Sequence, residues 1–168
     1  MDAISVTEFT VFARGVWLEL RRRAFTLCGD WHEAEDLAQT ALIKLYDRWE
    51  ELERREELAG YVNTVMVRAF ISERRTGRWK HERLVNRLPE RQVAPDIEAR
   101  FGDRQLILAA LDRLGPRQRA VVVLRYWFDM APDEVAAQLD CTSATIRSQT
   151  SRALLRLRRM MVEVGPPT

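Results

Sequence analysis

Hydrophobic residues recur at spacings of three and four along most of the chain, which is the period of amphipathic helices. The pattern predicts helices over 7–28, 30–49, 58–75, 104–114 and 116–127, then a short helix that begins at Pro132 and a longer one that follows a turn at 140–142 and runs to about 159. No alternating run of Val, Ile and Thr between turn residues predicts a strand. We therefore expect an all-α protein.

The stretch from 77 to 100 breaks this pattern. It contains Pro89 and Pro95 without a sustained hydrophobic period, which is typical of a linker. A chain of 168 residues is long enough for two small domains, each with its own core. We expect two small helical domains, 1–76 and 101–168, joined by a flexible linker over 77–100.

The predicted helix over 30–49 has two distinct faces. Asp30 suits its N-cap. Its core stripe consists of Ala34, Leu37, Ala38, Ala41, Leu42, Leu45 and Trp49. At 100° per residue, Asp36, Gln39 and Ile43 fall on the opposite side. An isoleucine among polar groups, turned away from the core, indicates a surface that meets a partner.

Residues 132–159 have the pattern of a helix-turn-helix. The apolar positions that can pack its two helices together are Val135, Ala136, Leu139, Ile146 and Leu154. Pro132 must start the first helix without a side-chain cap, and Thr142 can cap the second. Arg147, Ser148, Ser151 and Arg152 then form one outward group of hydrogen-bond donors near the start of the second helix, where a major groove is read. The alternative is an amphipathic hairpin whose basic face is merely solvated.

Charge is distributed unevenly along the chain. Residues 1–60 contain 8 basic and 13 acidic side chains, whereas 61–100 contain 9 and 5 and 101–168 contain 10 and 7. Of the 27 cationic side chains only Lys44 and Lys80 are lysines. The planar arginine fork suits phosphates and base edges, but genome base composition can produce the same bias, so arginine content alone decides little.

Two segments resemble one family of transcription proteins. The segment LGPRQRAVVVLRYWFDMAPDEVAAQLDCTSATIRSQTSRALLRLR resembles region 4 of sigma-70 family factors of the extracytoplasmic-function (ECF) type, and GDWHEAEDLAQTALIKLYDRW resembles region 2 of the same family. The phrases RQRAVVVLRY and SQTSRAL are similar to the SigE-like subgroup. The resemblance implies a sigma factor that binds core RNA polymerase and directs transcription initiation from particular promoters.

The resemblance also implies roles for residues of the first domain. Asp36, Leu37 and Gln39 would dock on the clamp helices of the largest polymerase subunit, and the outward face described above adds Ile43 to these polymerase-binding residues. The residues that read and open the −10 element would be Leu52, Tyr61, Thr64 and Arg68. Arg68 stands where an asparagine is common in the family, and Leu52 where some members have an aromatic residue.

In the second domain, the implied −35 contacts are Arg125 to phosphate and Arg147, Ser148, Ser151 and Arg152 to the duplex. The arginines further along, Arg158 among them, would hold phosphates. The family further implies contact with the flap region of polymerase and an anti-sigma factor as a possible partner.

Other classes of protein fit less well. The only histidines, His32 and His81, and the two cysteines, Cys28 and Cys141, lack partners at metal-ligand spacing, and no glycine-rich phosphate loop occurs, so we expect neither an enzyme nor a cofactor or metal site. No stretch resembles a signal peptide or a membrane span, which favours a cytoplasmic protein without membrane insertion. An ordinary helix-turn-helix repressor or activator remains the alternative function. Of the five tryptophans, all but Trp79 are expected in the core.

Overall fold

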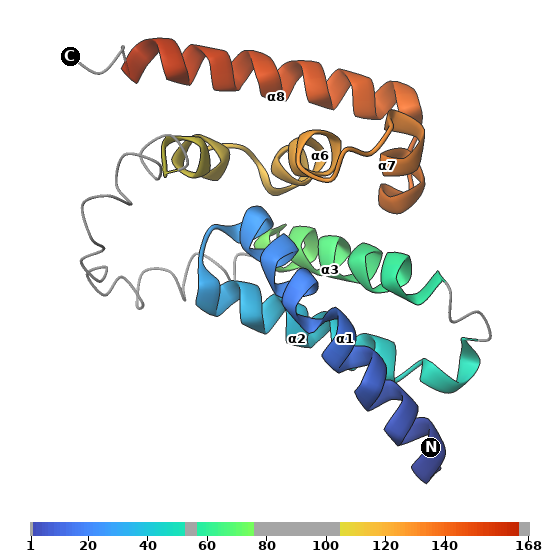
Figure 1. Cartoon of the computed structure of the whole chain (residues 1–168). Coiled ribbons are helices and arrows are strands. Elements are labelled where there is room, and N and C mark those ends of the chain that lie inside the picture. Colours follow the sequence, from blue (N-terminus) through green and yellow to red (C-terminus); the bar gives the residue numbers. More distant parts are fainter. Residues whose placement is uncertain (1, 53–56, 76–104, 165–168) are drawn as a thin grey trace, which may run out of the picture. The chain divides into compact units, whose positions relative to one another are not determined.

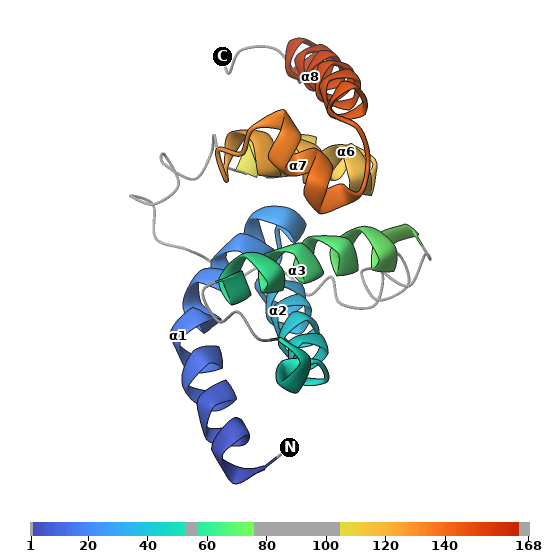
Figure 2. The same ribbon diagram turned by 90° about the vertical axis from the view of Figure 1, so that its right-hand side faces the viewer.

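The computed structural model describes residues 2–52, 57–75 and 105–164, and every regular element within these ranges is a helix (Figures 1 and 2). The chain divides into two compact units, Met1–Ser72 and Glu73–Thr168. The predicted all-α fold with two helical units is therefore confirmed. The predicted linker over 77–100 lies outside the described residues, so the domain limits at 76 and 101 stay a prediction. Within the described ranges, no helix combines the length and the apolar character that crossing a membrane requires.

The first unit begins with two long helices. Helix α1 (Ala3–Cys28) starts earlier than predicted because the Asp2 carboxylate accepts a hydrogen bond of 2.8 Å from the Ser5 N–H and so caps it. It ends at Gly29, whose φ of 76° is easily adopted by glycine. Helix α2 (Trp31–Tyr46) starts at the predicted cap, since Asp30 accepts from the Glu33 N–H at 3.0 Å. The predicted end of α2 at Trp49 is wrong, because that residue instead opens a 3-10 helix, η1 (Trp49–Glu51).

The core of the first unit lies between α1, α2 and α3 (Leu58–Arg75). Helices α1 and α2 pack against each other (Figure 1), and α3 runs across α2 in the view of Figure 2. Four alanines of α1 and α2, Ala24, Ala34, Ala38 and Ala41, have no exposed surface. Larger buried side chains complete the core: Leu20, Leu27, Leu45, Leu58, Val62, Met66, Val67 and Phe70. Small residues let the helix backbones approach closely, and the large ones fill the remaining volume.

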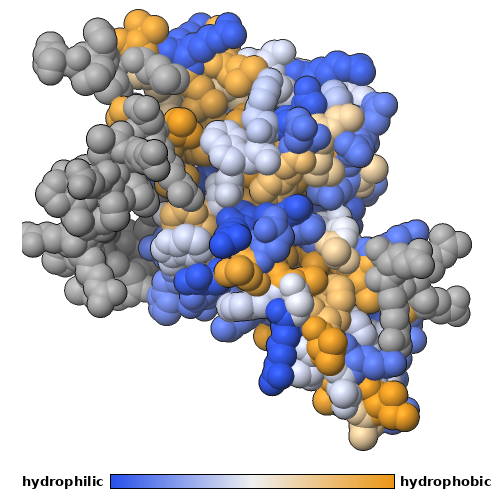
Figure 3. All heavy atoms as spheres, viewed as in Figure 1, coloured by the Kyte–Doolittle hydropathy of each residue, from blue (hydrophilic) through white to orange (hydrophobic). Residues whose placement is uncertain are grey.

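The start of α1 is less well covered. Hydrophobic side chains reach the surface around the beginning of this helix (Figure 3), where Ile4 is 70% and Val11 is 68% exposed. Buried α1 residues begin only at Leu20. The fully buried side chains of α1 therefore lie in its C-terminal part, although Phe9 and Phe12 also contact Trp49.

From residue 105 to 164, the second unit consists of a helix over 105–112 followed by α6 (Pro116–Tyr126), α7 (Pro132–Leu139) and α8 (Ser143–Val164). Pro116 and Pro132 occupy the first helical turns as predicted, and α7 has no side-chain cap. The Glu134 carboxylate instead accepts a 2.6 Å hydrogen bond from the Ala131 N–H that precedes α7. The core is built from Val121, Val122, Val123, Leu124, Val135, Leu139, Ile146 and Ala153.

Trp31 and Trp127 are exposed rather than buried as expected, and Trp17 is only half-buried. Trp127 is 47% exposed because α6 ends at Tyr126 and the chain turns away. Trp31 is 42% exposed, but its ring is not isolated: it stacks on Phe25 at a centroid distance of 4.1 Å. Both are surface residues with one covered face, a distribution typical of large aromatic side chains. Trp49, by contrast, is only 6% exposed, as expected.

Candidate functional site

The face of α2 that lies opposite its core stripe is exposed as predicted. Asp36 and Gln39 are exposed, and Ile43 is 61% exposed. Leu37 is only 4% exposed, as its place in the predicted core stripe requires, although the resemblance also assigned it a polymerase contact. Leu37 therefore supports this surface from below. We call Asp36, Gln39 and Ile43 the α2 face.

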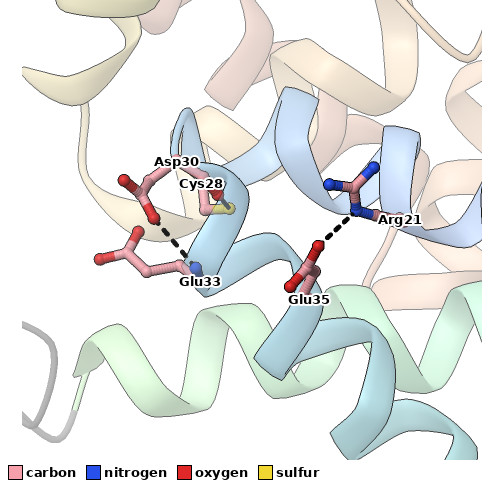
Figure 4. Close-up of polar contacts among 5 residues, drawn as sticks. All are labelled: Arg21, Cys28, Asp30, Glu33 and Glu35. Atoms are coloured by element: carbon pink, nitrogen blue, oxygen red, sulfur yellow. Dashed lines mark hydrogen bonds and ion pairs between the residues drawn. The ribbon is translucent and has the colours of Figure 1, made fainter. Parts of the chain in front are cut away.

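The start of α2 is fixed to α1 by a polar contact next to this face. The Arg21 Nε donates to Glu35 Oε1 across 2.8 Å, and the Arg21 guanidinium lies 4.4 Å from the centroid of the Trp31 ring (Figure 4). Figure 4 also shows the Asp30 cap, with the buried Cys28 thiol nearby. Because Glu35 precedes Asp36, this contact holds the first turn of the α2 face in place.

The predicted −10 residues lie on η1 and on one face of α3. Leu52 follows η1 and is half-buried. On α3, Tyr61 and Thr64 are half-buried and Arg68 is exposed. Tyr61 and Arg68 are seven residues apart, hence nearly aligned along the helix. Thr64 Oγ1 donates 3.1 Å to the Gly60 carbonyl of its own helix, which orients its hydroxyl.

An aromatic cluster lies beneath η1. The ring of Trp49 contacts Phe9 edge-on at 5.2 Å between centroids and Phe12 at 5.6 Å, while Tyr46 meets Phe9 at 5.0 Å. Such edge-on pairs add to the stabilisation that burial supplies. The 3-10 helix η1, which precedes Leu52, is thus anchored through Trp49 in the core of its unit.

Sequence reasoning missed Arg48, which joins η1 to α3. Its Nε lies 3.1 Å from Glu51 Oε2, and its Nη1 donates 3.1 Å to the hydroxyl of Tyr61, thirteen residues further along. The guanidinium lies 6.0 Å from the centroid of the Tyr61 ring. The sequence around Arg48 gives no indication of a partner thirteen residues away.

The helix-turn-helix forms with the predicted turn. Asp140 has a φ of 53°, and the Cys141 N–H donates 3.0 Å to the Ala136 carbonyl, which closes α7. Thr142 caps α8 as predicted, since its Oγ1 accepts from the Thr145 N–H at 3.2 Å. The Ser143 hydroxyl also donates to the Asp133 carboxylate of α7.

Two arginines of α6 hold the ends of α7. Arg125 Nη1 donates 2.7 Å to the Met130 carbonyl before α7, and Arg117 Nη2 donates 3.3 Å to the Leu139 carbonyl at its end. Arg125 is half-buried, so its guanidinium has a structural partner in addition to the phosphate contact expected of it. Arg117 carried no signal in the sequence, because its acceptor is a backbone carbonyl 22 residues away.

The predicted reading face of α8 is exposed in full. Its four members, Arg147, Ser148, Ser151 and Arg152, are all exposed. Ile146, Thr150 and Ala153 on the other side are buried, with 0%, 7% and 0% exposure. We call the four exposed residues the α8 face. It combines two guanidinium forks with two hydroxyls, which is a set of side chains that hydrogen-bonds base edges and phosphates.

The later turns of α8 carry a different surface. Arg156, Arg158 and Arg159 are exposed there, together with the apolar Leu155 and Val162. A shallow depression is lined by Leu155, Arg158, Arg159, Val162 and Glu163. This surface mixes apolar and basic groups, unlike the polar α8 face.

Comparison with known proteins gives matches in both units. Residues 18–80 match the family described as Sigma-70 region 2, and residues 104–157 match the family described as Sigma-70, region 4. The chain is 37% identical over 161 residues to the RNA polymerase sigma-E factor of Streptomyces coelicolor, which covers 94% of this chain and 88% of that protein. It is 28% identical over 150 residues to the ECF RNA polymerase sigma factor SigL of Mycobacterium tuberculosis, with 87% and 84% covered.

A solved structure is similar as well. The sigma factor RpoE of Bartonella quintana, crystallised in complex with the anti-sigma factor NepR, matches with a TM-score of 0.64 and 27% identity over 92% of this chain and 98% of that one.

Proposed function

The chain belongs to the sigma-70 family of RNA polymerase sigma factors, of the ECF type, and we propose that it carries out promoter-directed initiation through three surfaces: the α2 face, the −10 residues and the α8 face. Sigma factors of this family bind core RNA polymerase and promoter DNA. The α2 face would bind the clamp helices of the largest polymerase subunit. The −10 residues Leu52, Tyr61, Thr64 and Arg68 would read and open the −10 element.

The observation that carries this proposal is the exposed α8 face on a helix-turn-helix in one unit and the exposed α2 face in the other. A helix-turn-helix alone supports only DNA binding. The α2 face lies in the part of the chain that matches Sigma-70 region 2, and its exposed Asp36, Gln39 and Ile43 would supply the surface for a protein partner.

Within the α8 face, Arg147 and Arg152 would contact base edges of the −35 element, and Ser148 and Ser151 would support them. Arg125 would add a phosphate contact through the guanidinium N–H groups that do not bind the Met130 carbonyl. The later arginines of α8, Arg158 among them, would hold phosphates. The shallow depression beside them, which includes Leu155 and Val162, would contact the polymerase flap.

An anti-sigma factor is a further proposed partner, supported by the complex in which the similar Bartonella sigma factor was crystallised. Because a sigma factor acts on polymerase at promoters, this chain would work in the cytoplasm.

Binding to purified core polymerase tests the proposal against its main alternative, a helix-turn-helix repressor or activator. Immobilised full-length chain should retain core polymerase in the absence of DNA, and the Asp36→Arg chain should retain much less. Promoter binding by the chain with no retention of core would favour the repressor or activator instead.

A further inference from the structure

Arg48 occupies the junction between the two elements that carry the proposed −10 residues. It precedes η1, and its guanidinium contacts Glu51 on η1 and Tyr61 on α3, each at 3.1 Å. Leu52, the proposed −10 residue of the loop, directly follows Glu51. One side chain therefore connects both parts of the proposed −10 site.

The guanidinium is suited to this double contact. Its planar fork directs N–H groups along separate directions, so Nε can bind Glu51 while Nη1 binds Tyr61. A lysine ammonium is a single point charge and cannot reproduce this arrangement. The Glu51 carboxylate, and then Tyr61, raise the pKa of Arg48, so the cation persists at every working pH.

An exposed ion pair contributes little to stability by itself, so the pair of Arg48 with Glu51 alone would explain little. The bond to Tyr61 is different, because it crosses from one element to another. Arg48 directly precedes Trp49, which is only 6% exposed and whose ring contacts Phe9 and Phe12. Arg48 therefore links the Tyr61 hydroxyl to a segment that is packed against the core.

The direction of the hydrogen bond determines what this hydroxyl can do. A phenol has one donor proton and two acceptor lone pairs. In this structure the Tyr61 oxygen accepts from Arg48, so its own proton can be donated to an acceptor. A donor held by a cation is also polarised, which strengthens the bond that it makes.

We propose that Arg48 is a positioning residue for −10 recognition, which fixes the Tyr61 hydroxyl as the donor to a base edge in the unpaired −10 strand. The inference rests on the −10 role proposed above for Tyr61. A base that has left the stack exposes its hydrogen-bonding edge, and a donor of fixed position distinguishes an acceptor there from a donor.

The test measures binding of single-stranded −10 oligonucleotides to holoenzyme assembled from core polymerase and full-length chain. The oligonucleotides carry the preferred sequence or one altered base at a time, so duplex opening does not enter. Tyr61→Phe should reduce the discrimination at one position by about threefold to tenfold, the range expected for one hydrogen bond. Arg48→Gln should reduce discrimination at the same position to a similar extent.

The double variant Arg48→Gln/Tyr61→Phe should lose no more than either single variant, because both changes act through one hydroxyl. Arg48→Lys should show most of the loss, since it keeps the charge without the fork. Arg23→Gln is the matched control: Arg23 forms an exposed ion pair with Glu19 on α1 at 2.8 Å, far from η1 in sequence, and its loss should leave discrimination unchanged.

The outcomes separate the inference from the function on which it rests. If Tyr61→Phe leaves every position unchanged, the −10 role of Tyr61 is wrong, and with it the role of Arg48. If Tyr61→Phe reduces discrimination but Arg48→Gln does not, or the two losses add, only the role of Arg48 is wrong. Equal weakening on all oligonucleotides would indicate a phosphate contact and overturn the base-edge assignment. Full discrimination by Arg48→Lys would show that charge alone acts, which would also overturn the inference.

Discussion

The Ser143 hydroxyl donates a hydrogen bond to the Asp133 carboxylate, which joins the first turn of α8 to the first turn of α7. Together with the Thr142 cap, this contact sets the direction in which α8 leaves the turn. The α8 face begins only four residues later, at Arg147.

Replacing Asp133 by Ala should therefore weaken −35 binding by more than it weakens the fold. We expect a loss in unfolding free energy of about 1 kcal/mol, typical of one hydrogen bond, with a larger relative loss on a matched −35 duplex than on scrambled DNA. Urea unfolding and DNA titration measure the two quantities. Ala137→Ser, an exposed change on the same helix, is the control and should alter neither. Equal weakening on both DNAs would contradict an orienting role.

The left-handed residue between α7 and α8 gives a second prediction. Asp140 has a φ of 53°, a conformation that costs a residue with a Cβ atom about 1 kcal/mol and costs glycine almost nothing. Asp140→Gly should raise the unfolding free energy slightly, and Asp140→Ala should lower it, with roughly 1 kcal/mol between the two variants. Chemical unfolding followed by circular dichroism checks this order, and an Ala variant more stable than the Gly variant would contradict it.

The α2 face gives a prediction in which two neighbours behave oppositely. Asp36→Arg should weaken core polymerase binding and leave helicity unchanged, because Asp36 is exposed. Leu37→Ala should instead lower the unfolding free energy by about 2–5 kcal/mol, because Leu37 is only 4% exposed. As a control, Glu19→Arg makes the same charge reversal at an exposed position of α1 and should not affect binding to core polymerase. Unchanged core affinity for Asp36→Arg would exclude the α2 face as a polymerase contact.

Arg147 and Arg158 should differ in what they recognise. Arg147→Ala should cost about 1–3 kcal/mol on the preferred −35 sequence and little on scrambled DNA, because only the preferred sequence offers matched acceptors. Arg158→Ala should affect both DNAs alike and reduce the salt dependence of binding. Titrations of both variants on both DNAs at two salt concentrations separate these effects. Equal losses for Arg147→Ala on the two DNAs would refute its assignment as a base reader.

The cap of α1 should respond to pH. Hydrogen bonding from the Ser5 backbone N–H lowers the pKa of Asp2 below its ordinary value of 3.8. A lowered pKa in the folded state means that the cap stabilises α1 above the ordinary value and is lost as the pH falls through the folded value. Protection from amide exchange at the start of α1, measured relative to the intrinsic exchange rate at each pH, should therefore fall in acid, and Asp2→Asn should remove this loss of protection because asparagine caps without titrating.

Local signals in the sequence account for most of the fold and for the exposed faces. Pro116, Pro132, Asp30 and Thr142 act on neighbouring backbone groups, so their positions alone predict where helices begin. The position of Trp127 in the helical repeat suggested the core, but α6 ends one residue earlier, and helix ends are set by competition among neighbouring turns.

Contacts between distant segments could not be predicted in this way. The bonds of Arg48 to Tyr61 and of Arg117 to the Leu139 carbonyl span 13 and 22 residues, and an arginine at either position has the same local pattern as a solvated one. The resemblance to sigma factors supplied the −10 residues, whereas the helical period already placed Asp36 opposite the core stripe that contains Leu37, and the structure confirms this separation.

Transcription in vitro, with mapping of the start sites, tests the central claim most directly. Core polymerase with the full-length chain should start at fixed points downstream of one shared pair of −10 and −35 sequences, while core alone should not select them. The Asp36→Arg chain should lose this activity, and Arg147→Ala should lose it most where the −35 element is required. If the chain binds core yet selects no start sites, or represses transcription by other holoenzymes instead, the account is contradicted.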